Sequence, residues 1–279
     1  MLRERWRGII VASVLLVFAF TVAGSGRAIA QQPTAAEEMH AGVLAYKFSD
    51  YPGATEHFRA ALELNPNLPQ ARLFLATALA QQYIAGDDTP SNVALAEQAL
   101  DEFKKVLNDD PTEVERYKCI VPVASLNFNL KHFGLSREYY GQAIGLKPDD
   151  AHNYFMLGLM DWMEASRVRT KTRSEMKLGE SEMLSDPAAC AALREANQKD
   201  VEDGIQRMQK ALELQPADGD AMAYLNLLYR ERAEYECDDA EVRKADLKTA
   251  DEWVDKAVAV KKAVTEKPAA APETVPPPQ

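Results

Sequence analysis

The residues able to do acid–base, nucleophilic or metal chemistry are few in this chain and stand far apart. Adjacent carboxylates occur at Glu37–Glu38 and Asp109–Asp110, where helices are expected to begin or end, so we interpret them as caps or solvated turns. No nucleophile elbow, phosphate-binding loop or dinucleotide-binding glycine motif is present. The histidines have no HExxH or paired spacing that a metal site would need: His40, His57, His132 and His152. We therefore predict no catalytic residues, no metal and no cofactor, and the chain is not expected to be an enzyme.

The net charge of the chain argues against one class of partner, nucleic acids. The chain has 43 Asp plus Glu against 32 Lys plus Arg, a net charge of -11. Nucleic-acid binding needs a basic face that releases counterions, so we expect no nucleic-acid partner. Hydrophobic residues make up 47% of the chain, which is enough for an ordered domain with a sizeable core.

Residues 1–30 have the features of a secretory signal peptide. Basic residues begin it, residues 8–26 are uncharged and mostly apolar, and the small-x-small sequence Ala28-Ile29-Ala30 precedes Gln31. We predict cleavage after Ala30, export to the bacterial periplasm, and no stable membrane insertion afterwards. The alternative is an uncleaved N-terminal anchor, since 19 uncharged residues just span a bilayer.

One pattern recurs through the rest of the chain. A small residue is followed by a large one four positions on, a second small residue three further on, and a proline five after that. Small residues one turn apart let two helices approach closely, the large residue fills the gap, and proline ends the helix. Such helix pairs leave an apolar face uncovered, so neighbouring pairs must stack. The copies are Ala54-Phe58-Ala61-Pro66, Ala99-Phe103-Val106-Pro111, Ser136-Tyr140-Ala143-Pro148, Gly204-Met208-Ala211-Pro216, and Ala250-Val254-Ala257 without the proline.

With an upstream helix in each copy, this pattern resembles the tetratricopeptide repeat. The first copy is most similar, since Gly42, Tyr46 and Tyr51 precede its Ala54 and Phe58. The resemblance implies an all-α solenoid of about five antiparallel helix pairs, over residues 31–264. We place the repeats at 35–68, 69–113, 117–150, 151–218 and 219–262. Only the first and third copies keep the family's spacing between the two helices, so the others are elongated or interrupted.

The longest interruption lies in the fourth copy. Ser185-Asp186-Pro187 predicts the start of a helix that runs to about Leu214. Residues 165–184 are polar and form either a loop or an extension of the first helix. Their five basic residues are interpreted as a solvated stretch, with a surface for anionic lipid or an acidic partner as the alternative: Arg167, Arg169, Lys171, Arg173 and Lys177. Residues 265–279 are a Pro/Ala-rich tail, which we expect to be disordered.

The resemblance also implies where a partner binds, because first-helix residues line a concave groove in this family. Aromatic anchors with a few polar neighbours are typical of an interaction site, but the same residues suit an apolar seam between stacked helices. Met39 and Val43 occupy places where carboxylate-gripping relatives have Lys and Asn, so a more apolar ligand is expected. The repeat phase assigns seven candidates to the groove: Tyr46, Lys47, Phe128, Asn129, His152, Phe155 and Trp162.

Export would place the three cysteines where disulfides persist. Cys119 lies in an apolar part of the third copy and is interpreted as a small core residue. Cys190 stands near the start of the long helix of copy four, and Cys237 near the end of the next helix. Those helices should run antiparallel, so we predict a Cys190–Cys237 disulfide, with a helix break or tilt absorbing a mismatch of about 10 Å in length.

These features together predict a non-catalytic scaffold of the bacterial cell envelope that binds a protein or peptide partner. The alternative function is a small-molecule or glycan-binding protein, or an accessory subunit of an enzyme, that uses the aromatic groove around Phe155 and Trp162.

Overall fold

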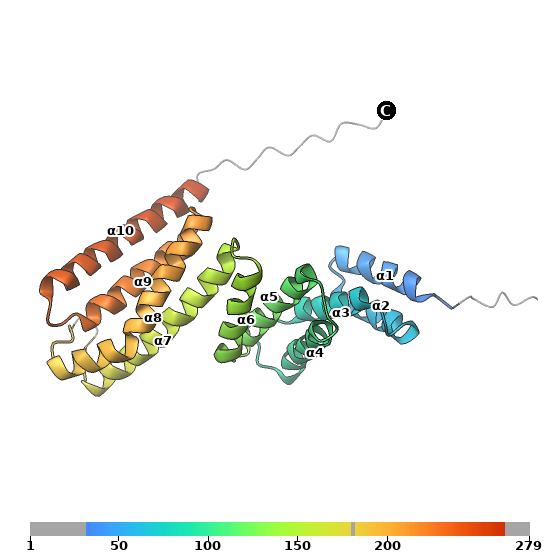
Figure 1. Cartoon of the computed structure of the whole chain (residues 1–279), viewed down its shortest axis with the longest axis horizontal. Helices are drawn as coiled ribbons and strands as arrows, with labels where there is room; N and C mark the ends of the chain where they lie inside the picture. The colour runs from blue at the N-terminus through green and yellow to red at the C-terminus, as the bar shows by residue number, and fades with distance from the viewer. Residues whose placement is uncertain (1–31, 180–181, 266–279) are drawn as a thin grey trace, which may run out of the picture. The chain divides into compact units, whose positions relative to one another are not determined.

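The computed structural model describes residues 32–179 and 182–265, and within them every regular element is an α-helix (Figure 1). The expected signal peptide lies outside these residues, and so does the expected tail from residue 266 onward. In order, the helices are α1 (Ala35–Lys47), α2 (Tyr51–Leu64), α3 (Pro69–Gln82), α4 (Pro90–Leu107), α5 (Glu113–Asn129), α6 (Phe133–Leu146), α7 (Ala151–Glu175), α8 (Pro187–Leu214), α9 (Gly219–Tyr235) and α10 (Ala240–Thr265).

Short polar side chains set many of the helix starts. Thr34 caps α1 and Thr112 caps α5, each in a capping box with the glutamate three residues on. Glu37 therefore caps a helix, as its position in the sequence indicated. Asp186 caps α8, whose bounds confirm the predicted helix over residues 187–214. Helix α5 begins at Glu113, four residues before the repeat boundary placed at residue 117.

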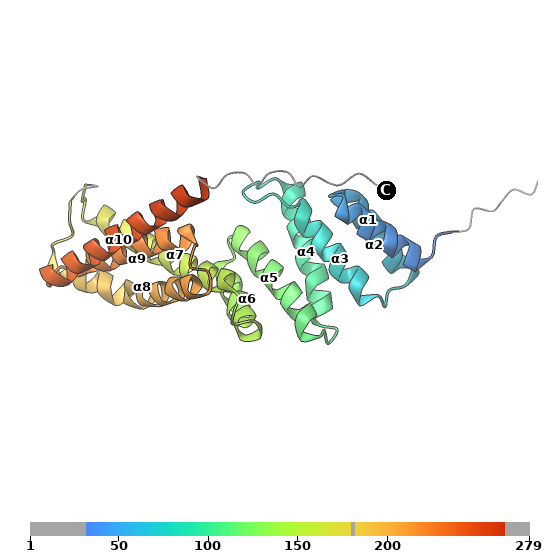
Figure 2. The same cartoon turned by 90° about the horizontal axis from the view of Figure 1, so that it is seen from above.

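Each helix packs against the next one along the chain, as Figures 1 and 2 show. The first helices of neighbouring pairs also contact each other: α1 with α3, α3 with α5, and α7 with α9. Buried side chains gather in three clusters of the described residues, centred on α2–α5, on α5–α7, and on α7–α9. The expected all-α arrangement of paired helices is confirmed.

The recurring small and large residues form the contacts between helices. In the first copy Ala54, Phe58 and Ala61 are fully buried. A side chain on Gly42 of α1 would place a Cβ only 2.6 Å from the Phe58 ring, so this glycine permits the close approach of α1 and α2. The last copy differs, because Val254 of α10 is 38% exposed where no further described helix covers it.

The fourth pair is elongated because α7 continues to Glu175. Residues 165–175 therefore extend the first helix, which was one of the two alternatives. Two of the five bases reach across to α9: Arg169 donates to both carboxylate oxygens of Glu231, at 2.9 and 2.8 Å, and Arg173 pairs with Glu234. The interpretation of this stretch as solvated is wrong for these two arginines, which tie α7 to α9.

A disulfide joins Cys190 in α8 to Cys237, with the Cα atoms 6.0 Å apart. Cys237 lies beyond the end of α9 at Tyr235, not within the helix as expected. Of the expected break or tilt, helix α8 shows no break, and the residues after α9 leave helical conformation and so cover more length per residue. The third cysteine, Cys119, is free and fully buried.

A candidate binding cleft between three helices

The seven groove candidates lie on three different helices. Tyr46 and Lys47 end α1, where the Tyr46 ring meets Tyr51 at 5.3 Å between centroids and Lys47 is exposed. Phe128 and Asn129 end α5, and the Phe128 ring lies 5.5 Å from Phe133 of α6. His152 begins α7, exposed, with its ring 5.9 Å from the buried Tyr140. The ring contacts therefore link these residues to their local neighbours and not to one another.

Phe155 and Trp162 are brought together by a residue that the repeat phase did not indicate. Both rings contact Tyr224 of α9 edge-on, at 5.7 and 5.2 Å between centroids. Both are half-buried against the α7–α9 cluster, and the Trp162 indole N–H has no hydrogen-bond partner among the described residues. These two aromatics line the seam between α7 and α9 and keep part of their surface open.

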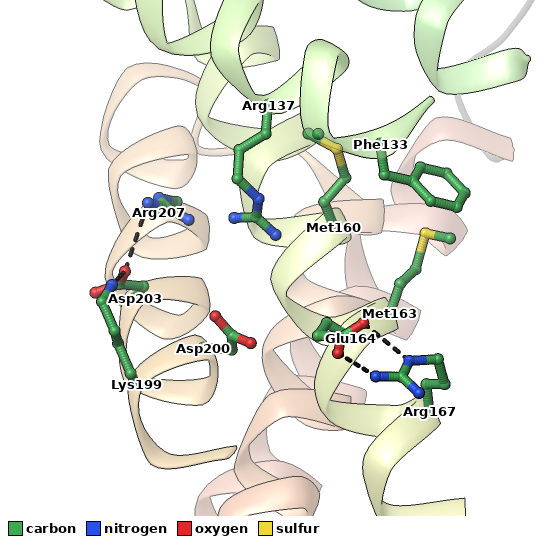
Figure 3. A pocket seen from close by; sticks show the side chains of 11 residues that line it. Phe133, Arg137, Met160, Met163, Glu164, Arg167, Lys199, Asp200, Asp203 and Arg207 are labelled. Carbon is green, nitrogen blue, oxygen red and sulfur yellow. Dashed lines mark hydrogen bonds and ion pairs between the residues drawn. The ribbon is translucent and has the colours of Figure 1, made fainter. Parts of the chain in front are cut away.

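A hollow in the described surface lies elsewhere, between α6, α7 and α8 (Figure 3). We call it the α6–α8 cleft, and its volume is about 590 Å³. Phe133, Met160 and Met163 make an apolar wall. The other lining side chains are charged: Arg137 from α6, Glu164 and Arg167 from α7, and Lys199, Asp200, Asp203 and Arg207 from α8.

A buried carboxylate holds the walls of the cleft in place. Asp161 of α7 is fully buried, and its two oxygens accept hydrogen bonds from Arg137 and Arg207. The chain approaches closely here because α8 has a glycine: a Cβ on Gly204 would lie 3.1 Å from the Asp161 Cβ. Since charge-assisted bonds are strong and directional, Asp161 ties both α6 and α8 to α7.

Every cation lining the cleft is paired within the chain. Besides the two arginines on Asp161, Arg167 donates to Glu164 at 3.0 Å and Lys199 to Asp203 at 2.6 Å. Among the lining carboxylates, Glu164 and Asp203 take part in these pairs, whereas the side chain of Asp200 makes no hydrogen bond or ion pair with any described residue. Burial, followed by the nearby Asp161 carboxylate, raises the pKa of Asp200 above its ordinary value.

Sequence reasoning missed this cleft because its parts come from distant positions. Arg137 stands 24 residues before Asp161, and Arg207 stands 46 residues after it. One signal was available in the sequence: Asp161 interrupts the apolar run from Met156 to Met163. A carboxylate on the buried face of a helix needs a cationic partner, so its place in the run indicates that arginines must reach it.

Across residues 32–179 and 182–265, no three His, Cys, Asp or Glu side chains gather closely enough to hold a metal ion. Over the same ranges, no helix has both the length and the apolar character needed to cross a bilayer.

The fold is similar to that of several solved proteins. A crystal structure of MamA matches with a TM-score of 0.53 and 16% identity, over 87% of this chain and 98% of that one. MamA from Desulfovibrio magneticus RS-1, residue 41 to its end, matches with a TM-score of 0.53 and 18% identity, over 82% and 96%. YrrB, a TPR protein with an unusual peptide-binding site, matches with a TM-score of 0.49 and 15% identity, over 82% and 92%.

At these identities the likeness concerns the fold, which is that of tetratricopeptide-repeat proteins, so the resemblance expected from the sequence is confirmed. No protein-family model matches the chain, and neither does any curated protein sequence.

Proposed function

We propose that this chain is a non-catalytic scaffold that binds a partner protein by taking one of its peptide segments into the α6–α8 cleft. The observation that carries the proposal is the preformed cleft itself. Its walls are tied together by the buried Asp161 and the two arginines, so little ordering of the protein accompanies binding. Its volume of about 590 Å³ falls within the range of ligand pockets.

The composition of the cleft supports binding over turnover. General acid–base catalysis needs a free titrating side chain that is placed beside a nucleophile or beside a second titrating side chain. In the cleft the arginines and Lys199 are engaged by carboxylates of the chain, and the lining holds no Ser, Thr, Cys or His. Asp200 alone has an unengaged carboxylate. One apolar wall opposite charged side chains suits recognition of a segment with mixed side chains.

Crosslinking tests the cleft as the binding surface. A photoreactive phenylalanine at Met163 should capture a stoichiometric partner, whereas the same group at Phe48, which directly follows α1 and is 78% exposed, should not. Met163→Glu should reduce partner recovery and leave the melting temperature nearly unchanged. Met176→Glu provides the matched control, because Met176 follows the same helix, is 41% exposed and lies outside the cleft lining. Capture from Phe48 with none from Met163 would place the partner on another surface.

We also propose that the scaffold works after export, in the periplasm of a bacterium. The support is the sequence of residues 1–30, with its basic start, apolar stretch and small residues before Gln31. Intact-mass measurement of the fractionated protein should give a chain that begins at Gln31. A full-length chain retained in the membrane fraction would favour the anchored alternative.

A second candidate function rests on the aromatic seam. Phe155 and Trp162 with Tyr224 present a partly open aromatic surface, and the Trp162 indole nitrogen is buried beneath it. Such a surface suits the apolar face of a sugar ring, in keeping with the glycan-binding alternative. Titration with oligosaccharides, followed by tryptophan fluorescence, tests it: a saturable change that Trp162→Phe removes would support this function.

A further inference from the structure

We infer that the α6–α8 cleft selects a lysine or arginine adjacent to a large apolar side chain in the segment it binds, with Asp200 receiving the cation and Phe133, Met160 and Met163 receiving the apolar group. The inference rests on the proposed function, because it names the partner's chemistry at the same cleft.

The ion pairs within the cleft indicate whether its ligand carries a positive or a negative charge. Arg137 and Arg207 both engage Asp161, while Arg167 engages Glu164 and Lys199 engages Asp203. Each of these cations already has a carboxylate beside it, which weakens its attraction for an anionic ligand, and any N–H donor still unused on the arginines acts against that counter-charge. Asp200 offers a cationic ligand a carboxylate that has no partner among the described residues. In Figure 3 this side chain lies between α7 and α8 and faces the cleft.

The electrostatic surroundings of Asp200 favour the same ligand. The pKa of Asp200 is raised by burial and by the carboxylates of Asp161 and Glu164, while Arg137 and Lys199 act in the opposite direction. The charged form of Asp200 is therefore held in an unfavourable environment, which a ligand cation would relieve. Over longer distances the net charge of -11 attracts a cationic segment.

The apolar wall explains why the cation alone is not enough. Phe133 is 38% exposed although it is a large hydrophobic residue, and it lies beside Met160 and Met163 across the cleft from Asp200 (Figure 3). Methionine side chains are flexible and polarisable, so they adapt to different apolar groups. The wall therefore favours a large apolar residue next to the Lys or Arg of the bound segment, and it does not discriminate strongly among Leu, Met and Phe.

Selection from a phage-displayed library of random 12-residue peptides tests the inference on the full exported chain. The wild type should enrich peptides with Lys or Arg next to a large apolar residue. Asp200→Lys should lose this enrichment or replace the basic residue by an acidic one. Asp255→Lys provides the control, since it makes the same change of charge at an exposed position of α10 outside the cleft lining, and it should enrich the same peptides as the wild type.

The enriched peptide is then synthesised, and its affinity is measured for the wild type and for Asp200→Asn, which keeps the shape of the side chain. We expect about a fivefold loss, in the range of a partly exposed ion pair. An equal affinity in both proteins, or enrichment of acidic peptides by the wild type, would overturn the inference.

Failure of the proposed function would give different results from failure of the inferred charge selection. If no peptide is enriched by the wild type, or if the enriched peptide does not compete with crosslinking from Met163, the cleft is not the peptide site. If a peptide competes at Met163 but carries no basic residue, the cleft binds peptides and only the inferred charge selection is wrong.

Discussion

Replacing both Cys190 and Cys237 by alanine should lower the free energy of unfolding by up to about 4 kcal/mol. The two cysteines are 47 residues apart in the sequence, and closing a loop of that length removes about this much conformational freedom from the unfolded chain. Alanine is preferred to serine because Cys190 is 4% exposed, and a hydroxyl there would be buried.

The folded structure should survive this change, because other contacts hold the same segments. Arg194 of α8 reaches Glu236 and Asp238 beside Cys237, at 2.9 and 2.5 Å. Arg243 of α10 donates to the backbone oxygen of Leu184 at 3.0 Å. The lost stability should therefore come from a more extended unfolded state, and the dependence of unfolding on urea should become steeper.

Urea unfolding followed by circular dichroism checks the magnitude, and peptide mapping without reductant checks the bond. Dithiothreitol should shift the wild type to the midpoint of the double variant and leave the variant unchanged. In the folded protein the remaining thiol is not expected to react, because burial raises the pKa of Cys119 to about 11 and keeps it protonated.

Two results would refute the reasoning in different ways. Free thiols on both Cys190 and Cys237 in the exported protein would show that the disulfide does not form. An intact disulfide whose removal changes stability by less than about 1 kcal/mol would show that the unfolded chain already keeps these segments together.

The remaining predictions concern the cleft and its supports. Gly204→Ala should destabilise the fold by about 1–3 kcal/mol in urea unfolding, because the new Cβ would lie 2.8 Å from the nearest side-chain carbon. Gly141→Ala, where nothing lies within 4 Å, should be neutral or slightly stabilising. Asp161→Ala should lower stability by about 3 kcal/mol, since two arginines lose their partner, and Arg137→Ala by clearly less; equal losses would contradict the shared carboxylate. Acidification should weaken binding of the cationic peptide, since binding needs the carboxylate of Asp200 and its raised pKa brings protonation at a higher pH than for an ordinary aspartate. The affinity of Asp200→Asn, measured over the same pH series, should change less.

Much of the fold follows from local patterns that the sequence displays. The alternation of Ala54, Phe58 and Ala61 predicts both a helix and its buried face, because the spacing of small and large residues is itself the packing rule. The start of α8 after Asp186 was equally readable, since a capping residue and a proline act within one turn.

The cleft and the length of α7 depend on partners that are far away in sequence. Arg169 and Arg173 look like a solvated basic stretch until Glu231 and Glu234 are placed beside them, about 60 residues further on. In the same way, Phe155 and Trp162 suit a groove or a seam equally well, and only the position of Tyr224 distinguishes the two. Local periodicity shows which face of a helix is apolar but not which other helix covers it.

The buried carboxylates have a consequence for how the chain reaches its native state. Helix pairs of similar pattern have many similar ways to associate, and apolar faces alone distinguish them weakly. Asp161, Glu231 and Asp246 are each nearly or fully buried, and each is bound by arginine from another helix. A helix docked on the wrong neighbour would leave such a carboxylate buried without a cation, which is strongly unfavourable. Misassembled intermediates of α7–α10 should therefore be short-lived. The buried ion pairs favour the native order of the helices over the alternatives during folding.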